Sequence, residues 1–309
     1  MPPIDLRSRG HVPLATWTED PDAAEPVVLI LGGFLTSPPL YVALARRLRR
    51  RGAAEVLIGR AWTPDWVLAA SRGLGPLVTR AGRGLVRAGE RAATSPRARG
   101  APVLVVGHSA GGLLGRLLTS PVPYAGRQLG AAARIGALVT LGTPHHLSAS
   151  ADLGGRLAPL ASAFTDAVIP GAAFAPHVGY VTVASRSIRG APDGDQREQT
   201  AHRFYRGLLG DELSVAEGDG LIPVASALLD GATRIVLPNA VHGQFGGGPW
   251  YGSDEIVDAW WPAALDAWHG ALRARVEATD KGPGHAEGPD RALRGTSSGL
   301  HLTEGRPVG

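Results

Sequence analysis

The sequence predicts an α/β fold in which a mostly parallel, doubly wound sheet carries helices on both faces. Short, continuous apolar segments are the first observation, because a strand that is buried on both faces of a sheet has no polar side. The second observation is that helical patterns separate these segments, as they do where parallel strands need crossover connections. The predicted strands are 27–31, 55–58, 103–106, 137–141, 180–183 and 234–237.

The first half of the chain begins with a polar, proline-rich stretch, residues 1–26, in which residues 11–17 are expected to form a short edge strand. After the strand at 27–31, residues 41–51 place leucines opposite a row of arginines, which is the pattern of an amphipathic helix. Residues 64–93 are also helical in pattern, but glycines and a proline interrupt them. We therefore expect a long, broken helix on one face of the sheet.

The second half contains one stretch that fits no regular strand–helix unit, residues 147–178, which are rich in Ala, Leu, Pro and Gly. A small lid or cap over a pocket and ordinary surface helices are both open interpretations. Residues 253–276 predict a final helix, which Pro262 is expected to kink. The rest is polar and rich in Gly and Pro, which is typical of disorder. The expected organisation is one domain over 1–276 and a disordered tail over 277–309.

The composition limits the classes of partner and chemistry. There is no cysteine, which excludes disulfides, thiol catalysis and thiolate metal sites. The net charge is +4, and Lys281 is the only lysine among the 31 basic residues. Arginine clusters such as 46–51 and 83–91 are expected to be solvated helix faces. No aromatic residues interleave with them, so no nucleic-acid partner is expected, and peripheral contact with an anionic membrane surface is the better alternative.

The start of the chain has neither the apolar segment nor the cleavage pattern of a signal peptide. No stretch reaches the ~18 apolar residues that a membrane helix needs. A cytoplasmic location is therefore the expectation.

A candidate nucleophile follows the strand at 103–106. The sequence Gly107-His-Ser-Ala-Gly-Gly112 leads into leucines at helical spacing, so Ser109 is expected at a sharp turn from strand to helix. Such a turn projects the hydroxyl toward a base and a substrate, and small residues on either side relieve the crowding that it causes. A glycine-rich turn with a helix-capping serine is the alternative interpretation of the same residues.

A nucleophilic serine needs a histidine base and an acid that orients this base. Triads whose serine lies on a strand–turn–helix run in the chain order Ser, then Asp or Glu, then His. His242 is the candidate base, because it comes shortly after the last predicted strand. Asp219 is the favoured acid, since glycines on both sides allow a tight turn and an apolar Leu-Ile-Pro sequence follows closely. Its rivals are Asp195, Asp211 and Glu217.

Attack by such a serine also needs two N–H donors for the oxyanion that develops. Ala110, directly after the serine, is expected to supply one of them. The other is expected from the loop after the first predicted strand, where Gly32-Gly33 lets the backbone approach the substrate. Phe34 is the favoured donor there, and Leu35 is the rival. The candidates to line a substrate pocket are Leu35, His108 and His145.

Four segments of the chain share one resemblance. They are Gly107-His-Ser-Ala-Gly-Gly112, Leu141-Gly-Thr-Pro-His145, Gly218-Asp-Gly-Leu-Ile-Pro223 and Trp250-Tyr-Gly-Ser-Asp-Glu255. Together they resemble the lipase branch of the α/β-hydrolase superfamily, and most of all bacterial and plant α/β hydrolases similar to GPI inositol-deacylases. The resemblance covers about residues 26–270. It implies the α/β-hydrolase fold and esterase or lipase chemistry with Ser109, Asp219 and His242 as the triad.

The sequence also departs from that family in two places. Gly32-Gly33 stands where many lipases have His-Gly. Some bacterial lipases of this branch bind calcium through an aspartate just after the catalytic histidine, but here Gly243-Gln244 follows His242. We therefore expect no metal and no cofactor.

The sequence thus predicts a serine hydrolase that cleaves carboxylic esters of a small molecule or lipid through an acyl-enzyme intermediate. The apolar composition of 147–178 suggests a hydrophobic acyl group. Acyl transfer, thioester hydrolysis and amide hydrolysis on the same triad are alternatives, because pocket shape and water access decide between them. A non-catalytic protein with this fold that binds protein or lipid is a further hypothesis.

Overall fold

The computed structural model describes residues 17, 19–127, 130–148, 157–210 and 216–280. At its centre lies a six-stranded sheet in which every pair of neighbouring strands is parallel. The six strands predicted from the apolar segments are confirmed. In spatial order they are β2 (Glu55–Ile58), β1 (Val27–Leu31), β3 (Val103–His108), β4 (Ile135–Leu141), β5 (Gly179–Ser185) and β8 (Thr233–Leu237).

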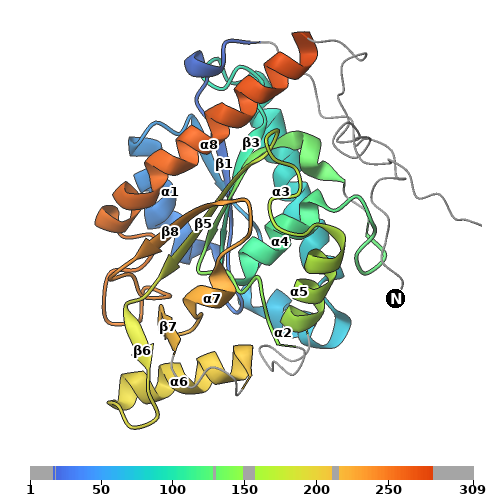
Figure 1. Ribbon diagram of the computed structural model, residues 1–309. Coiled ribbons are helices and arrows are strands. Elements are labelled where there is room, and N and C mark those ends of the chain that lie inside the picture. Colours follow the sequence, from blue (N-terminus) through green and yellow to red (C-terminus); the bar gives the residue numbers. More distant parts are fainter. Residues whose placement is uncertain (1–16, 18, 128–129, 149–156, 211–215, 281–309) are drawn as a thin grey trace, which may run out of the picture.

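Helices cover both faces of this sheet (Figure 1). One face packs against α1 (Val42–Arg50) and the long α8 (Asp254–Asp280). The other face packs against α2 (Thr63–Arg72), α3 (Gly75–Thr94), α4 (Ala110–Thr119) and α5 (Leu157–Val168). Short 3-10 helices occur at Pro21–Ala23, Pro38–Tyr41 and Ala131–Arg134. The doubly wound architecture predicted from the sequence is confirmed.

The burial of both faces of the sheet by helices explains why the sequence of β1 is continuously apolar. Val28 and Ile30 belong to the core beneath α1 and α8, whereas Val27, Leu29 and Leu31 belong to the core beneath α3 and α4. Successive side chains of a strand point to opposite faces of the sheet. Because both faces are buried, each position in the strand is apolar. Burial of one such side chain stabilises the fold by about 1.5–3 kcal/mol.

The arginine cluster at the end of α1 binds the start of α8. Arg47 and Arg51 contact Asp254 at 2.9 and 3.1 Å, and Arg51 contacts Asp258 at 2.7 Å. Arg47 also donates to the Gly252 carbonyl at 2.7 Å. This cluster was expected to be a solvated helix face. Arg46, Arg49 and Arg50 are exposed, as expected, and the cluster also forms ion pairs, because the two aspartates lie one helical turn apart on the facing helix.

The predicted helices differ from the observed ones in their bounds. The broken helix consists of α2 and α3, and the break lies at Gly73, whose φ is 75°. The final helix contains Pro262 and continues past the predicted end to Asp280. Within the described residues, no helix combines the length and the apolar character that crossing a bilayer requires.

Several expectations fall partly outside the described residues. These are residues 11–16 of the expected edge strand, 149–156 of the expected lid, and 281–309 of the expected tail. Trp17, the described residue of that edge segment, is not in a strand.

The described part of the expected lid or cap includes α5, which packs against α4. The buried side chain of Arg116 in α4 contacts Asp166 at 3.3 Å and donates to the Ile169 carbonyl at 2.9 Å. These bonds anchor α5 to the layer of helices that covers the sheet. A role of this segment as a lid stays a prediction.

A small second layer lies at one end of the main sheet (Figure 1). In it, β6 (Ile188–Gly190) and β7 (Ala216–Gly218) form an antiparallel pair, against which α6 (Gln196–Leu209) packs. The short α7 (Val224–Ala227) follows. Neither β6 nor β7 is predicted from the sequence, because three-residue strands carry too little periodicity to be recognised. This layer supplies the loop that contains Asp219.

Candidate active site

Ser109 lies at the turn between β3 and α4. Its φ is 55° and its ψ is −131°, an uncommon backbone conformation for a residue with a side chain. The Ser109 N–H donates to the Leu141 carbonyl at 2.9 Å, and the Thr143 hydroxyl donates to the Ser109 carbonyl at 2.9 Å. These bonds tie the turn to the end of β4 and to the loop that follows, and so they hold the strained conformation.

Close packing around this turn explains its small residues. A Cβ on Gly107 would lie 2.5 Å from the α4 backbone, and a Cβ on Gly111 would lie 2.1 Å from the Leu31 carbonyl oxygen. From the other side, a Cβ on Gly33 would lie 2.7 Å from the Ser109 Cβ. These distances are shorter than normal contacts. The end of β1, the turn and α4 therefore approach one another only because these positions are glycine.

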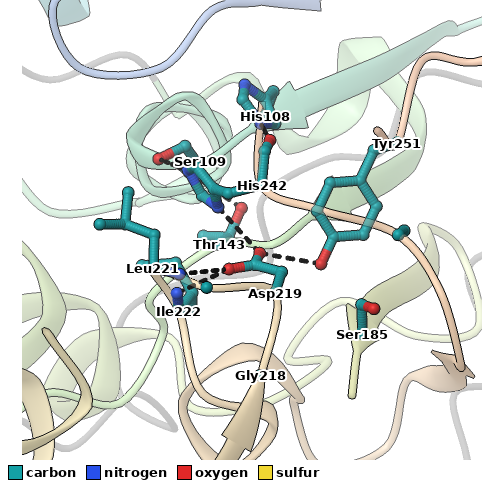
Figure 2. A network of polar contacts seen from close by, with 12 residues as sticks. His108, Ser109, Thr143, Ser185, Gly218, Asp219, Leu221, Ile222, His242 and Tyr251 are labelled. Carbon is teal, nitrogen blue, oxygen red and sulfur yellow. Dashed lines mark hydrogen bonds and ion pairs between the residues drawn. The ribbon is translucent and has the colours of Figure 1, made fainter. Parts of the chain in front are cut away.

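His242 bridges Ser109 and Asp219 (Figure 2). Its Nε2 is 3.0 Å from the Ser109 Oγ, and its Nδ1 is 2.8 Å from the Asp219 Oδ2. The His242 main-chain N–H also donates to the Asp219 carbonyl at 2.9 Å, so the two loops are joined by backbone as well as by side chain. The fold thus brings together the three residues that the sequence analysis selected.

The Asp219 carboxylate is buried and accepts hydrogen bonds at both oxygens (Figure 2). Oδ1 accepts the N–H groups of Leu221 and Ile222 at 2.9 and 2.7 Å. Oδ2 accepts the Tyr251 hydroxyl at 2.9 Å, beside His242. Burial alone raises the pKa of this carboxyl, but attraction to His242 and the hydrogen bonds from His242 and the two amides outweigh it. The pKa of Asp219 is therefore below its ordinary value of 3.8.

The acid reaches this position from outside the main sheet, since Asp219 follows β7. Gly142, with a φ of 54°, makes room for it, because a Cβ there would lie 2.6 Å from the Asp219 Oδ2. The rival acids are placed differently. Asp195 accepts N–H groups at the start of α6, Glu217 is exposed, and Asp211 lies outside the described residues.

Two main-chain N–H groups beside Ser109 have no hydrogen-bond partner within the described part of the chain. They belong to Phe34 and Ala110. Because α4 begins at Ala110, the dipole at the helix N-terminus adds a positive potential there. The N–H of Leu35 is likewise unpaired among the described residues. The assignment of Phe34 and Ala110 to an oxyanion hole therefore stays a prediction, with Leu35 as the rival of Phe34.

An apolar cavity of about 180 Å³ lies beside Ser109 and His242. Its walls come from the loop after β1, from α2, from the start of α3, from α4 and from the loop after β4. The rings of Phe34 and Trp66 pack edge to face in one wall, with 5.8 Å between their centroids. The apolar lining consists of Phe34, Trp66, Leu74, Ala110, Leu113, Pro144 and Leu221.

Of the three predicted pocket residues, His108 lines this cavity, whereas Leu35 and His145 are not in its described lining. The Leu35 side chain is 45% exposed to solvent. His145 is fully buried, and its Nε2 is 2.9 Å from the Thr140 Oγ1. Burial holds the pKa of His145 well below its ordinary value. The main-chain N–H of His145 donates to the Ser226 carbonyl, so the His145 backbone is tied to α7.

A larger and more open groove of about 580 Å³ also reaches His242. Ile188 of β6 and Arg197 of α6 contribute to its lining, so the second layer builds much of it. The groove and the apolar cavity share Leu221, His242 and Gly243. One histidine thus borders an enclosed apolar space and an open, partly polar one.

Several residues that contact the site had no role in the sequence analysis. Thr143 and Tyr251 lie within segments that carry the family resemblance, but a motif does not show which atom a hydroxyl contacts. Trp66 and Leu113 carry no local signal of a pocket wall. The helical pattern of α2 and α4 predicts which side is buried, and it does not predict which buried side chains border a cavity.

Comparison with solved structures shows the same fold in known hydrolases. The mature form of the lipase BlEst2 from Bacillus licheniformis aligns with a TM-score of 0.52 and 18% identity, over 82% of this chain and 95% of that one. The phospholipase PlaB from Legionella pneumophila, in complex with thio-NAD, aligns with a TM-score of 0.53 and 15% identity, over 83% of this chain and 63% of PlaB. No protein-family model and no curated protein sequence matches the chain.

With the parallel sheet and the serine turn, these similarities establish the α/β-hydrolase fold that the sequence resemblance implied. The finer resemblance to GPI inositol-deacylases stays a prediction.

Asp219 predicts a pH-dependent contribution to stability. Its pKa is lower in the folded protein than in the unfolded chain, so the unfolded chain takes up the proton first as the pH falls. The contribution is complete well above pH 3.8 and is lost as the pH falls through the lower, folded pKa. We expect Asp219→Asn to lower the free energy of unfolding by about 1–3 kcal/mol at pH 7. This deficit shrinks below pH 3.8. Urea unfolding at a series of pH values measures it, and a deficit that is constant down to pH 2.5 contradicts the account.

Proposed function

We propose that this protein is a serine hydrolase that cleaves carboxylic esters through an acyl-enzyme intermediate. The observation that carries the proposal is the position of His242, whose ring nitrogens lie at hydrogen-bond distance from the Ser109 Oγ and the Asp219 Oδ2. A buried carboxylate at Nδ1 keeps the ring proton on that nitrogen. The lone pair of Nε2 then faces the serine hydroxyl, which is the geometry that general-base activation needs.

In the proposed reaction, the Ser109 Oγ attacks the ester carbonyl carbon while the His242 Nε2 takes the hydroxyl proton. The N–H groups of Phe34 and Ala110 stabilise the negative charge on the carbonyl oxygen. The imidazolium then gives its proton to the leaving alcohol as the C–O bond breaks, and the acyl group stays on Ser109. Water, deprotonated by His242, attacks this acyl group and releases the acid. Asp219 stays ionised and stabilises the imidazolium.

The spaces around His242 support an ester with a short, apolar acyl group. The cavity beside Ser109 has apolar walls, and its volume lies below the roughly 300–1,000 Å³ of sites for drug-sized ligands. The larger groove offers room for the alcohol part of the substrate. The proteins of similar fold include a lipase and a phospholipase by name, which agrees with a small ester or a lipid as the substrate.

Contact with a lipid surface stays a prediction, and exposed apolar side chains support it. Leu35, Trp62, Val67 and Leu68 are 39–60% exposed. They lie on α2, directly before it, and on the loop after β1. The same two segments supply Trp66 and Phe34 to the cavity wall. An apolar surface next to the cavity suits a substrate that is presented at a lipid surface.

The hypothesis of a non-catalytic binding protein is less well supported. A binding protein has no use for a serine in a strained backbone conformation that is hydrogen-bonded to a histidine, which in turn is bonded to a buried carboxylate. Acyl transfer, thioester hydrolysis and amide hydrolysis use the same geometry and differ in the acceptor or the leaving group. Assays of the purified protein should therefore include thioester and anilide analogues of the best ester.

Replacement of the nucleophile tests the proposal. We expect Ser109→Ala to abolish labelling by a fluorophosphonate probe and to lower kcat for p-nitrophenyl esters by about 10⁴-fold or more. The matched control is Ser120→Ala, because Ser120 is also buried, lies at the other end of α4, and donates its hydroxyl to the Val122 carbonyl. The control should label and turn over esters as the wild type does. A folded wild-type protein that neither labels nor hydrolyses any ester contradicts the proposal.

A second prediction concerns the acyl chain. Leu113 and Leu118 are both buried in α4, but only Leu113 lines the described cavity. Truncation of either residue costs about 2–5 kcal/mol of stability. We expect Leu113→Ala to raise the ratio of kcat/KM for p-nitrophenyl octanoate over the butyrate roughly tenfold, because it lengthens the acyl space. Leu118→Ala should leave this ratio unchanged. An equal ratio in both variants contradicts the assignment of the cavity to the acyl group.

A further inference from the structure

A chain of hydrogen bonds lies behind the site and runs through two side chains that the proposed reaction does not use. The His108 Nε2 is 2.8 Å from the main-chain carbonyl oxygen of His242, and the His108 Nδ1 is 2.9 Å from the Tyr41 hydroxyl. This hydroxyl also accepts the N–H of Gly33 at 2.9 Å. The chain therefore connects the loop of the base to the loop of the expected oxyanion hole. We name these two side chains the Tyr41–His108 link.

The chemistry of the partners determines the direction of each bond. A carbonyl oxygen only accepts, so His108 carries its proton on Nε2. Burial lowers the pKa of His108 to about 3, so this ring is neutral and its Nδ1 accepts the Tyr41 proton at 2.9 Å. The Thr36 Oγ1 is a second acceptor for this proton, at the longer distance of 3.2 Å. Burial raises the pKa of Tyr41, so the hydroxyl keeps that proton. A lone pair of the Tyr41 oxygen then receives the Gly33 N–H.

Gly33 is bonded on both of its peptide groups. Its N–H donates to Tyr41, and its carbonyl accepts the Thr36 hydroxyl at 2.7 Å and the Thr36 N–H at 3.2 Å. The Gly33 carbonyl and the Phe34 N–H belong to one planar peptide group. The two bonds from Thr36 to the Gly33 carbonyl therefore set the direction in which the Phe34 N–H points, and the bond from the Gly33 N–H to Tyr41 fixes the peptide group directly before it.

The surroundings of the link are aromatic and closely packed. His108 and Tyr41 are 4% and 2% exposed. The Trp250 ring packs against both, with centroid distances of 5.5 Å to His108 and 6.1 Å to Tyr41. A Cβ on Gly32 would lie 2.7 Å from the Tyr41 ring. The two side chains thus have little freedom to turn away from the bonds that they make.

We propose that Tyr41 and His108 are positioning residues that hold the loop of His242 and the loop of Phe34 at fixed positions relative to Ser109. The inference rests on the proposed function and adds to it the residues that align its base and its oxyanion donor. Neither side chain gives or takes a proton in the reaction. The link acts through main-chain groups, namely the His242 carbonyl and the Gly33 N–H.

Loss of the link should therefore affect the transition state more than substrate binding. The oxyanion forms only after the serine has attacked, so a misdirected Phe34 N–H lowers kcat and leaves KM nearly unchanged. Replacement of a residue that matters only for folding should not lower kcat while it leaves KM unchanged. A boronic acid provides a second measure, because it forms a tetrahedral adduct with the serine and places an oxygen in the oxyanion hole.

The experiment compares Tyr41→Phe with the wild type, with p-nitrophenyl butyrate as substrate and butaneboronic acid as inhibitor. We expect kcat to fall about tenfold or more, KM to change by less than about twofold, and the inhibition constant of the boronic acid to rise by the same factor as kcat/KM falls. The matched control is Tyr180→Phe. Tyr180 is also buried, but it lies near the start of β5, away from the strand ends that carry the site, and its variant should keep the wild-type kcat.

Variants of His108 test the link independently of Tyr41. His108→Ala removes both bonds, whereas His108→Gln places an amide N–H where it can donate to the His242 carbonyl. We expect the alanine variant to lose kcat as Tyr41→Phe does and the glutamine variant to regain part of it. The double variant Tyr41→Phe/His108→Ala should lose much less than the product of the two single losses, because both changes break one chain of bonds.

Four results would overturn the proposal. Folded Tyr41→Phe with wild-type kcat and wild-type boronate affinity contradicts it directly. A loss expressed only in KM, or two single losses that multiply in the double variant, contradicts a shared positioning role. If the wild type itself neither labels with a fluorophosphonate nor hydrolyses esters, the proposed function fails and the positioning role fails with it. An active wild type with an unaffected Tyr41→Phe overturns the positioning role alone.

Discussion

The strained turn at Ser109 is the constraint on which the rest of this structure depends. Its positive φ is tolerated because the Leu141 carbonyl and the Thr143 hydroxyl hold the turn from the side of β4. Glycines at 33, 107 and 111 allow the neighbouring backbones to approach it. A substitution at any of these glycines would have to move a strand end or a helix. The parallel sheet places the other residues of the site around this turn, because it brings the carboxyl ends of β1, β3, β4 and β8 to one edge.

The acid and the base reach the turn by different routes. His242 follows β8 of the main sheet, whereas Asp219 comes from the small layer that β6, β7 and α6 build. The two are joined by their side chains and by the bond from the His242 N–H to the Asp219 carbonyl. The Tyr41–His108 link extends this connection to the loop of Phe34. Hydrogen bonds to main-chain groups thus connect three loops that are distant in the sequence, those of Phe34, Asp219 and His242.

The sequence predicts the main sheet well because its strands are buried on both faces, and continuous runs such as 27–31 have few other interpretations. Ser109, Asp219 and His242 could be selected because a triad imposes residue types, glycine neighbours and an order along the chain. The second layer was missed, since its strands at Ile188–Gly190 and Ala216–Gly218 are too short to show a period. His145 is not part of the described cavity lining, and its neighbours in sequence do not show that its ring is fully buried.

The most direct test of the account is a measurement of the acyl-enzyme itself. The purified protein would be mixed with p-nitrophenyl butyrate, quenched with acid within milliseconds, and examined by intact-mass and peptide mass spectrometry. The account predicts a burst of p-nitrophenol and a protein that carries one butyryl group, located on the peptide that contains Ser109. Turnover without any such adduct, or an adduct on another residue that persists in Ser109→Ala, would contradict it.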